Sequence, residues 1–382
     1  MMDGLTVLIV LVCLASLTWW LLAASQLRKL LRRTVPAAPG KRPGISFFKA
    51  FPACHCDKEA AIWQQSVKSL LPHLIADDEF IVGIHVEDRE RFSAWGESLQ
   101  SECGEACVRL VFDTPPTRHI NQKVNWMHRL AEEASRPLWF WSDADIELPD
   151  NFGAALHADA ARLDQCGMVT YAYRIVDAGS AWGLLDAAFV NTTMLPGLAL
   201  LRNKPDLCFG LGAGMLFRAD EFREKIEWAE LGRQLTDDNF MGKAMRPVQM
   251  GSVTLTTRMG NATPRTALSH YYRWEKTIRW TEPLAYFCQL LVQPIAFTLL
   301  GLCLLPLKTA LPLFLVFLVA ETAYLLSAFH MVGMPRSRQL LAAPLVPLFR
   351  FGVWLAVWLP FGVWWRGKYW SKAQYHEGEA DS

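Results

Sequence analysis

The sequence predicts an α/β fold with a mostly parallel sheet, joined to apolar membrane helices. Strand-like and helix-like segments alternate between about residues 44 and 250, and this alternation indicates a parallel sheet with helices on both faces. Acidic residues follow several of the strand-like segments. Uncharged apolar runs, long enough to cross a bilayer, lie near both ends of the chain.

The strand-like segments are short apolar runs, and helix-like segments separate them. Val124, Met127, Leu130, Ala131 and Ala134 recur at helical spacing, and Pro137 ends this helix. A second helix is expected from Pro149 through Leu163. The expected strands are Phe80–Val86, Val108–Phe112, Leu138–Trp141 and Met168–Tyr173. Ligands of such a sheet bind at the carboxyl ends of the strands, where the acidic residues fall.

The first 27 residues predict an N-terminal transmembrane helix. Gly4 to Leu27 carries no charge, and a basic cluster at residues 28–33 follows it. The run is longer than the apolar part of a signal peptide, whose basic residues come first. The positive-inside rule places the N-terminus outside and residue 28 onward in the cytoplasm.

Two further apolar runs predict a membrane hairpin over residues 283–335. They cover Pro283–Leu307 and Thr309–Pro335. The next apolar stretch, Gln339–Trp365, is interrupted by Arg350 and three prolines, and it has basic residues at both ends. We therefore expect residues 339–370 to form a re-entrant or interfacial segment with a basic tail.

These runs predict a multi-pass integral membrane protein, in a bacterial inner membrane or its equivalent, with a cytoplasmic domain at residues 34–282. Composition agrees, because 52% of residues are hydrophobic and the 16 Trp suit lipid–water interfaces. The 38 basic and 37 acidic residues nearly balance, which argues against a nucleic-acid partner. A charged fraction of only 20% excludes a disordered chain.

The strongest chemical pattern is Asp143-Ala144-Asp145, directly after the strand Leu138–Trp141. Carboxylate oxygens are the ligands that Mn²⁺ and Mg²⁺ prefer, and such an ion neutralises a diphosphate leaving group. On its own the pattern also fits an acidic turn exposed to solvent, but further acidic residues occur after another strand and before a helix of the same domain. Asp88 ends the first strand, where it could bind a nucleotide base or ribose or be an ordinary polar strand end.

Three other segments carry candidate residues. Asp237 and Asp238 precede a helix expected at Phe240–Met245, where an acid serves either as a helix cap or as a general base. Lys123 opens a helix and suits contact with an anion. The third segment lies just before the membrane hairpin and contains His270, Arg273 and Trp274. These residues can contact phosphate, or they can be the basic and aromatic residues that commonly flank a membrane span.

Taken in order, these segments resemble the membrane glycosyltransferases of the family 2/21 type. They resemble most the ceramide glucosyltransferase family and its bacterial relatives, including hopanoid-pathway glycosyltransferases. The similar stretches are Asn121-Gln122-Lys123-Val124-Asn125, Ser142-Asp143-Ala144-Asp145, Thr236-Asp237-Asp238, His270 through Trp274, and Trp365-Arg366-Gly367-Lys368-Tyr369. The resemblance covers nearly the whole chain and implies a Rossmann-like GT-A domain.

The resemblance also implies a reaction, namely inverting transfer of a sugar from a UDP-sugar donor to the hydroxyl of a membrane lipid. Asp238 would be the general base, with Asp237 as the alternative. Asp145 and Asp143 would hold Mn²⁺ or Mg²⁺. The other donor-binding residues would be Asp88 or Glu87, Lys123, His270, Arg273 and Trp274.

The resemblance is not complete. The family's first acidic site is usually followed by an Asp-Pro pair, but Glu87-Asp88-Arg89-Glu90 stands here, so Asp88 and Glu87 both remain candidates. His270 replaces the Gln of processive polysaccharide synthases, which favours a lipid acceptor over a growing polymer.

Several alternatives stay open at this point. Glucose to ceramide is the family default, but the donor could carry N-acetylglucosamine or galactose. The acceptor could be a hopanoid, a diacylglycerol or a polyprenyl phosphate. The chain could also be a non-catalytic membrane protein that retains the GT-A fold.

Overall fold

The computed structural model describes residues 4–103, 107–114, 117–260, 262–365 and 368–372. Its residues form two compact units. The first, called the sheet unit, comprises Leu31–Tyr173 and Leu201–Arg258. The second, called the helical unit, comprises Arg174–Leu200 and the described residues of Met1–Leu30 and Met259–Gln374. Residues 174–200 and 259–282 thus belong to the helical unit, although the sequence analysis placed them in one domain at 34–282.

A seven-stranded sheet forms the centre of the sheet unit, with the strand order β3-β2-β1-β4-β8-β6-β9. Strands β3, β2, β1 and β4 are parallel, β8 is antiparallel to both of its neighbours, and β6 and β9 are parallel. The strands are β1 (Ile45–Ala50), β2 (Glu79–His85), β3 (Cys107–Asp113), β4 (Leu138–Trp141), β6 (Met168–Thr170), β8 (Met215–Arg218) and β9 (Val248–Met250). This mostly parallel sheet confirms the predicted fold class.

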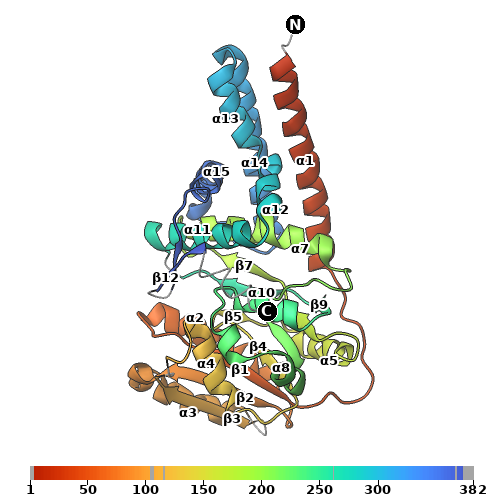
Figure 1. Cartoon of the computed structure of the whole chain (residues 1–382), viewed down its shortest axis with the longest axis vertical. Coiled ribbons are helices and arrows are strands. Elements are labelled where there is room, and N and C mark those ends of the chain that lie inside the picture. The colour runs from red at the N-terminus through yellow and green to blue at the C-terminus, as the bar shows by residue number, and fades with distance from the viewer. Residues whose placement is uncertain (1–3, 104–106, 115–116, 261, 366–367, 373–382) are drawn as a thin grey trace. The chain divides into compact units, whose positions relative to one another are not determined.

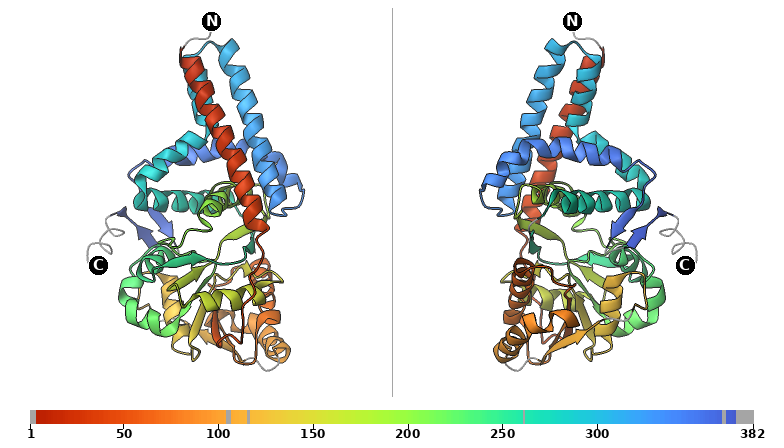
Figure 2. Two further views of the ribbon diagram at one scale, coloured as in Figure 1. Left: turned by 90° about the vertical axis from the view of Figure 1, so that its right-hand side faces the viewer. Right: turned by 90° about the vertical axis from the view of Figure 1, so that its left-hand side faces the viewer.

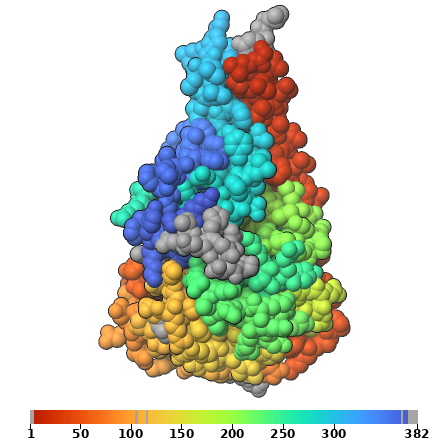
Figure 3. All heavy atoms as spheres, in the orientation of Figure 1, coloured from red at the N-terminus to blue at the C-terminus, as the bar shows by residue number. Residues whose placement is uncertain are grey.

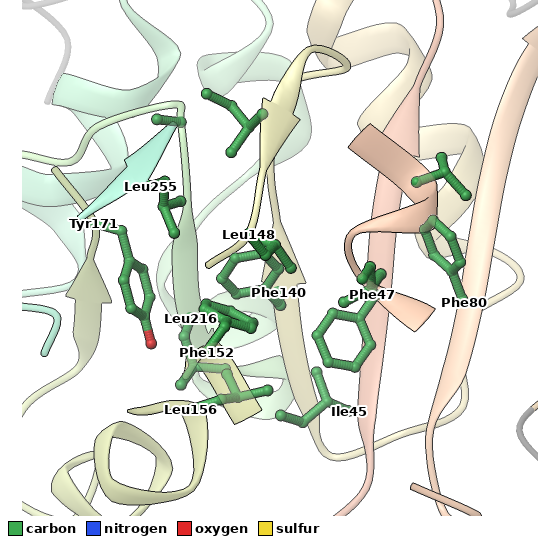
Figure 4. Packing of buried hydrophobic residues seen from close by; sticks show 14 of the residues in the cluster. Ile45, Phe47, Phe80, Phe140, Leu148, Phe152, Leu156, Tyr171, Leu216 and Leu255 are labelled. Carbon is green, nitrogen blue, oxygen red and sulfur yellow. The ribbon is translucent and has the colours of Figure 1, made fainter. Parts of the chain in front are cut away.

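Helices cover both faces of the sheet because the side chains of each strand alternate. On one face, Phe47 and Phe140 pack with Phe152 and Tyr171, as Figure 4 shows. Helices α2 (Asp57–Lys68), α3 (Arg89–Glu102) and α5 (Phe152–Arg162) contribute to this core. The core is rich in aromatic side chains, and each large side chain contributes roughly 2–3 kcal/mol of burial free energy.

The opposite face is covered by α4 (Gln122–Ala131), α8 (Ala219–Lys225) and α9 (Trp228–Leu231). Trp139 and Trp141 of β4 pack there against Phe222, and Trp141 stacks on Trp228. Gly83 of β2 lies under Trp126 of α4, and a Cβ at Gly83 would come within 2.7 Å of that ring. A glycine is therefore needed for α4 to approach the sheet this closely.

The strands at Phe80–Val86, Val108–Phe112 and Leu138–Trp141 are confirmed to within two residues. The expected strand Met168–Tyr173 is divided, because β6 ends at Thr170 and β7 (Tyr173–Asp177) begins three residues later. Helix α10 is Asp237–Ala244 rather than Phe240–Met245, so the two acids occupy its first turn. A separate antiparallel pair joins β5 (Ile146–Glu147) to β10 (Leu255–Arg258).

The helical unit is built from α1 (Gly4–Leu31), α6 (Gly183–Phe189), the π-helix η3 (Val190–Met194), α7 (Leu195–Leu201), α11 (Pro264–Thr281), α12 (Pro283–Cys288), α13 (Pro294–Leu304), α14 (Leu307–Met331), the 3₁₀ helix η5 (Arg338–Leu345) and α15 (Val346–Ala356). Helix α1 runs beside α13 and α14 (Figures 1 and 2), and Ile9 and Cys13 pack there against Leu305 and Phe317. The space-filling view shows α1, in red, directly against these helices (Figure 3).

Four described helical segments are long and apolar enough to cross a membrane: Gly4–Leu31, Gly183–Leu201, Leu307–Met331 and Arg338–Ala356. Gly183–Leu201 is mostly buried, which a lipid-facing span would not be. The run Pro283–Leu307 is not one straight helix. It bends by 68° between Val292 and Pro294, because a proline has no N–H to donate and disfavours helix at the residue before it.

A short antiparallel pair, β11 (Val363–Trp365) and β12 (Lys368–Trp370), ends the described helical unit. Trp364 and Tyr369 are exposed and contact each other. Arg366 and Gly367 of the expected basic-aromatic tail lie outside the described residues.

Candidate active site

Four charged side chains of the sheet unit gather around Gly212; they are called the Gly212 cluster and are Lys123, Asp143, Asp237 and Asp238. Lys123 Nζ lies 2.8 Å from Asp143 Oδ1 and 3.4 Å from Asp237 Oδ2. Gly212 N donates to Asp238 Oδ2 at 3.0 Å, and Gly212 O accepts from Asp143 N at 3.2 Å. Residues from three separate stretches of sequence therefore meet at one glycine.

The ends of a strand and of two helices carry these residues. Asp143 follows β4 at its carboxyl end, Lys123 stands in the first turn of α4, and the paired acids stand in the first turn of α10. Ligands of parallel sheets bind at this edge, and helix N-termini favour negative charge. The local geometry thus follows from where each element begins or ends.

Asn121 fixes the position of α4 relative to α10. Its Oδ1 accepts from Lys123 N at 2.9 Å, which caps the start of α4. Its Nδ2 donates to Gln234 O at 2.9 Å and to Asp237 Oδ1 at 3.4 Å. Asn121 is fully buried, so these bonds are shielded from water. In the sequence, Asn121 was only part of a motif. In the structure it caps α4 and connects that helix to the start of α10.

The cluster holds its charges in a buried setting. Burial lowers the pKa of Lys123, but the charges of Asp143, Asp237 and Asp238 outweigh burial and raise the pKa above its usual range. Burial, and then the charge of Asp237, raise the pKa of Asp238 to about 6. Lys123 therefore stays cationic, while Asp238 can take or release a proton near neutral pH.

Asp145, the second acid of the Asp143-Ala144-Asp145 loop, lies apart from the bonds around Gly212. Its Oδ2 accepts a hydrogen bond from Thr257 Oγ1 at 2.6 Å. Burial, and then the charge of Asp143, raise its pKa. Thr257 lies on β10, which pairs with β5 immediately after the loop, so the small sheet holds this carboxylate in place.

Lys49 lies beneath the same loop, and the sequence analysis did not identify it. It is in β1 and is almost completely buried, and its Nζ donates to Asp143 O and Ile146 O, each at 2.9 Å. Burial lowers the pKa of Lys49 to about 8, against the opposing charges of nearby acids. The one signal in the sequence is a charged residue inside an otherwise apolar strand-like run.

Asp88 and Glu87 follow β2 and belong to the 3₁₀ helix η2 (Val86–Asp88). Asp88 Oδ2 accepts from Cys54 N at 2.8 Å, in the loop after β1. Glu87 is exposed. Asp88 therefore connects the carboxyl ends of two neighbouring parallel strands, whereas Glu87 faces solvent.

The three remaining candidates stand on α11 of the helical unit. His270 Nδ1 lies 3.1 Å from Asp186 Oδ2, and its ring lies 3.9 Å from that of Trp274, one helical turn away. Trp274 stacks on Phe189, and the Arg273 guanidinium lies over the Trp365 ring at 5.6 Å. The structure thus joins His270 to Trp274 and to Asp186, a partner that the sequence analysis did not identify, whereas Arg273 contacts Trp365.

The chemistry of the loop fits a hard divalent cation, since Asp143 and Asp145 offer carboxylate oxygens two residues apart. Asp143 is partly exposed, and Asp145 has only one oxygen held by Thr257. Within the described part of the chain, no group of three or more His, Cys, Asp or Glu side chains is arranged to hold a metal. The two aspartates could therefore supply part of a coordination shell, with further oxygens from a bound ligand.

A family model described as "Glycosyl transferase family 21" matches residues 6–375. The chain belongs to glycosyl transferase family 21. It is a membrane-associated glycosyltransferase with a GT-A fold, and its α/β sheet and apolar helices agree with this family. No curated protein matches the sequence.

Two solved structures are similar to this family 21 chain. A mannosyltransferase from Pyrobaculum calidifontis, PcManGT, solved with GDP-Man and Mn²⁺, is 14% identical, with a TM-score of 0.45 and 93% of each chain covered. GalNAc-T7, solved with UDP, GalNAc and Mn²⁺, is 12% identical, with a TM-score of 0.39, over 65% of this chain and 52% of that one.

Proposed function

We propose that the protein transfers a sugar, most simply glucose, from a UDP-sugar to the hydroxyl of a membrane lipid such as ceramide, with inversion at the anomeric carbon. One observation carries the proposal, namely the Gly212 cluster of one lysine and three aspartates at the carboxyl end of β4. Family membership supports the glycosyl transfer, and the apolar helices support a lipid acceptor.

The cluster contains groups for both halves of a displacement. The lipid hydroxyl attacks the anomeric carbon from the face opposite UDP, and the carbon–oxygen bond to UDP breaks as the new bond forms. Asp238 takes the hydroxyl proton, and its pKa of about 6 leaves it largely ionised at pH 7. Lys123 contacts the diphosphate and offsets the charge that grows on it.

Asp238 is a better base than its neighbour Asp237. Asp237 Oδ1 accepts from the neutral amide of Asn121, and Asp237 Oδ2 lies 3.4 Å from the Lys123 ammonium. Asp238 accepts from two backbone N–H groups, those of Gly212 and Asn239. Burial, and then the charge of Asp237, raise the pKa of Asp238 to about 6 although Lys123 opposes this, so Asp238 can accept a proton near neutral pH.

Asp143 and Asp145 would hold Mn²⁺ or Mg²⁺. When bound, the ion would neutralise charge on the diphosphate. Lys49, which holds the backbone of the same loop, keeps the two carboxylates in register with the end of β4. Asp88 would bind the base or ribose of the nucleotide, because it already connects the loops after β1 and β2.

In the helical unit, Arg273 and His270 would contribute to binding of the donor phosphates, and Trp274 would pack beside the acceptor. Asp186 holds the ring of His270 and so orients it. We propose that the sheet unit lies on the cytoplasmic side, because basic residues follow α1 and precede η5. A soluble sugar nucleotide would then reach the site directly.

The test is a matrix of donors and acceptors. The purified full chain in detergent receives Mn²⁺ or Mg²⁺ with UDP-glucose, UDP-N-acetylglucosamine or UDP-galactose, and with ceramide, hopanoid polyol, diacylglycerol, polyprenyl phosphate or no lipid. Mass spectrometry identifies the products. One glycosylated lipid, lost with EDTA, is the expected result.

Variants sharpen this test. Asp238→Asn should lower turnover by about 10²–10⁴-fold, the usual contribution of a general base, and should still bind the donor. Asp220→Asn, an exposed acid on α8, is the matched control and should behave as the wild type. Near-normal turnover of Asp238→Asn would refute the base assignment, and absence of both turnover and UDP-sugar binding would favour a non-catalytic protein.

A further inference from the structure

The turn that carries Gly212 joins the charged cluster to the centre of the sheet. It comprises residues 211–214, is called the Gly212 turn, and leads directly into β8. A hydrogen bond of 3.1 Å from Gly214 N to Leu211 O closes the turn. The N–H and the C=O of Gly212 contact two aspartates of the cluster. The shape of this turn therefore decides where these two aspartates lie.

Glycines allow the turn to pack closely but do not fix its shape. A Cβ at Gly210 would come within 2.5 Å of Asp238 O, and a Cβ at Gly214 would come within 2.8 Å of Leu255 Cδ1. Side chains are thus excluded directly before the turn and at its end. Because glycine has the widest range of backbone conformations, contacts from outside the turn have to select one of them.

Thr170, the last residue of β6, supplies such a contact with its hydroxyl. Its Oγ1 accepts from Leu211 N at 2.8 Å and donates to Gly214 O at 3.3 Å. One hydroxyl therefore binds both the first N–H and the last C=O of the Gly212 turn. Thr170 is 0% exposed, so both hydrogen bonds are shielded from bulk water.

The sheet holds Thr170 in place from both sides. Thr170 pairs with Met215 of β8 and with Met250 of β9. The next residue, Tyr171, donates from its backbone N–H to Gly214 O at 2.9 Å. A β-branched side chain also has few allowed rotamers. The hydroxyl is thus presented to the turn by a rigid part of the fold.

We propose that Thr170 is a positioning residue for the Gly212 cluster. Its hydroxyl fixes the Gly212 turn, and the turn in turn fixes the carboxylate of Asp238 through Gly212 N and the backbone of Asp143 through Gly212 O. The proposal rests on the proposed function for the view that these aspartates act in sugar transfer. Thr170 itself contacts no reacting atom in this scheme.

Two substitutions separate positioning from simple packing. Thr170→Val keeps the shape of the side chain and removes the hydroxyl, so Leu211 N loses this buried acceptor. Thr170→Ser keeps the hydroxyl and removes a buried methyl group. If Thr170 only packs the core, both variants should affect stability alone. If it positions the turn, removal of the hydroxyl should have an effect on the turn that removal of the methyl does not have.

Amide hydrogen exchange tests the first link without any substrate. The full chain in detergent is exchanged and digested, and mass spectrometry follows the peptide that covers residues 209–214. Thr170→Val should raise the exchange rate of this peptide at least tenfold, because Leu211 N and Gly212 N then open more often. Thr170→Ser should stay within about twofold of the wild type, and peptides from β1 and β2 should be unchanged in both variants.

Turnover with the donor and lipid that the wild type uses tests the second link. Thr170→Val should lower kcat about 10–10²-fold, the usual effect of misplaced catalytic groups. Its UDP-sugar affinity should stay within about threefold, because the residues proposed to bind the nucleotide stand on α4 and after β2. Thr170→Ser should keep kcat near the wild-type value, although loss of a buried methyl group lowers its melting temperature by about 2–4 °C.

Thr298→Val is the matched control. Thr298 is also buried, and its hydroxyl bonds only within α13 of the helical unit in the described structure. The variant should leave both the exchange of residues 209–214 and kcat unchanged. If Thr170→Val does not fold, Thr170→Ala takes its place and is compared with Thr170→Ser, from which it differs only by the hydroxyl.

The proposal is wrong if a folded Thr170→Val shows wild-type exchange in residues 209–214. It is equally wrong if Thr170→Val and Thr170→Ser lose the same share of kcat, or if both change only the melting temperature. A wild type that transfers no sugar would refute the proposed function instead. The exchange measurement would then still decide whether Thr170 fixes the Gly212 turn.

Discussion

Replacing Lys49 with Met should separate the positioning of the Asp143–Asp145 loop from the stability of the fold. Met has nearly the same shape as Lys but cannot donate to Asp143 O and Ile146 O, which Lys49 contacts at 2.9 Å each. The loop then loses the two bonds that hold it over β1. We expect a large loss of activity with a small change in stability.

The magnitude follows from two opposing contributions. Two hydrogen bonds from a charged group contribute roughly 3–6 kcal/mol together. Burial opposes this, because a pKa lowered from 10.5 to about 8 corresponds to about 3 kcal/mol of lost stability in the charged form. The net loss should be about 0–3 kcal/mol. A loop displaced by about 1 Å lowers the rate about 10²-fold, since catalytic geometry is that sensitive.

The assay compares kcat/KM for sugar transfer with the midpoint of thermal unfolding in the same detergent. Lys68→Met, at an exposed position at the end of α2, is the matched control and should leave both quantities unchanged. If Lys49→Met keeps most of its activity, the loop does not depend on Lys49. If it loses activity only in proportion to unfolded protein, its role is structural and the reasoning is wrong.

Two further predictions concern the Gly212 cluster. Asp238 acts as a base only when it is ionised, so a plot of log kcat/KM against pH should fall with unit slope below about pH 6. If this fall at low pH is unchanged in both Asp238→Glu and Asp237→Asn, the assignment is wrong. Gly212→Ala would place a Cβ 2.7 Å from Lys123 Nζ and 3.3 Å from Asp143 Oδ2. The flexible lysine side chain should therefore move, and kcat/KM should fall about tenfold or more. The free energy of unfolding should fall by about 1 kcal/mol. Gly197→Ala, whose Cβ would meet nothing within 4 Å, should change neither quantity, and a fully active Gly212→Ala would exclude a role for the Lys123 position.

The pH dependence of stability has the opposite sign from that of activity. The pKa of Asp238 is raised in the folded protein, so the folded state holds this proton more tightly than the unfolded state does. Its contribution to stability is therefore lost as the pH rises from about 4 to about 6, while activity is gained over the upper part of this range. Asp238→Asn should remove both effects together.

The sequence predicted β2, β3 and β4 of the parallel half of the sheet, because these strands are apolar runs followed by acids, but it did not identify β1, which contains Lys49. Val108–Phe112 closes with Asp113, and Leu138–Trp141 is followed by Ser142 and Asp143. The short strands β8 and β9 were not predicted, since they are not apolar runs followed by an acid as β4 is. Their places follow from pairing with β4 and β6, which depends on the whole fold.

The charged residues of the Gly212 cluster were all predicted as site candidates, but the groups that hold them were not. Asp143 and Asp238 stand out in the sequence because acids end a strand or open a helix. Gly212 and Lys49 do not, since their importance depends on what lies within 3 Å of them in three dimensions. Asp186 was missed for the same reason, because 84 residues separate it from His270.

The two apolar helices α14 and α15 show most clearly where pattern reading ends. A charged residue such as Glu321 or Arg350 within an apolar run weakens the prediction that the run spans a membrane. Arg350 was one reason to expect an interfacial segment. The structure pairs the two at 3.7 Å. Since a buried charge is strongly unfavourable without a partner, the two residues that weaken the apolar pattern of each segment depend on the packing of α14 with α15, which no pattern within one segment can show.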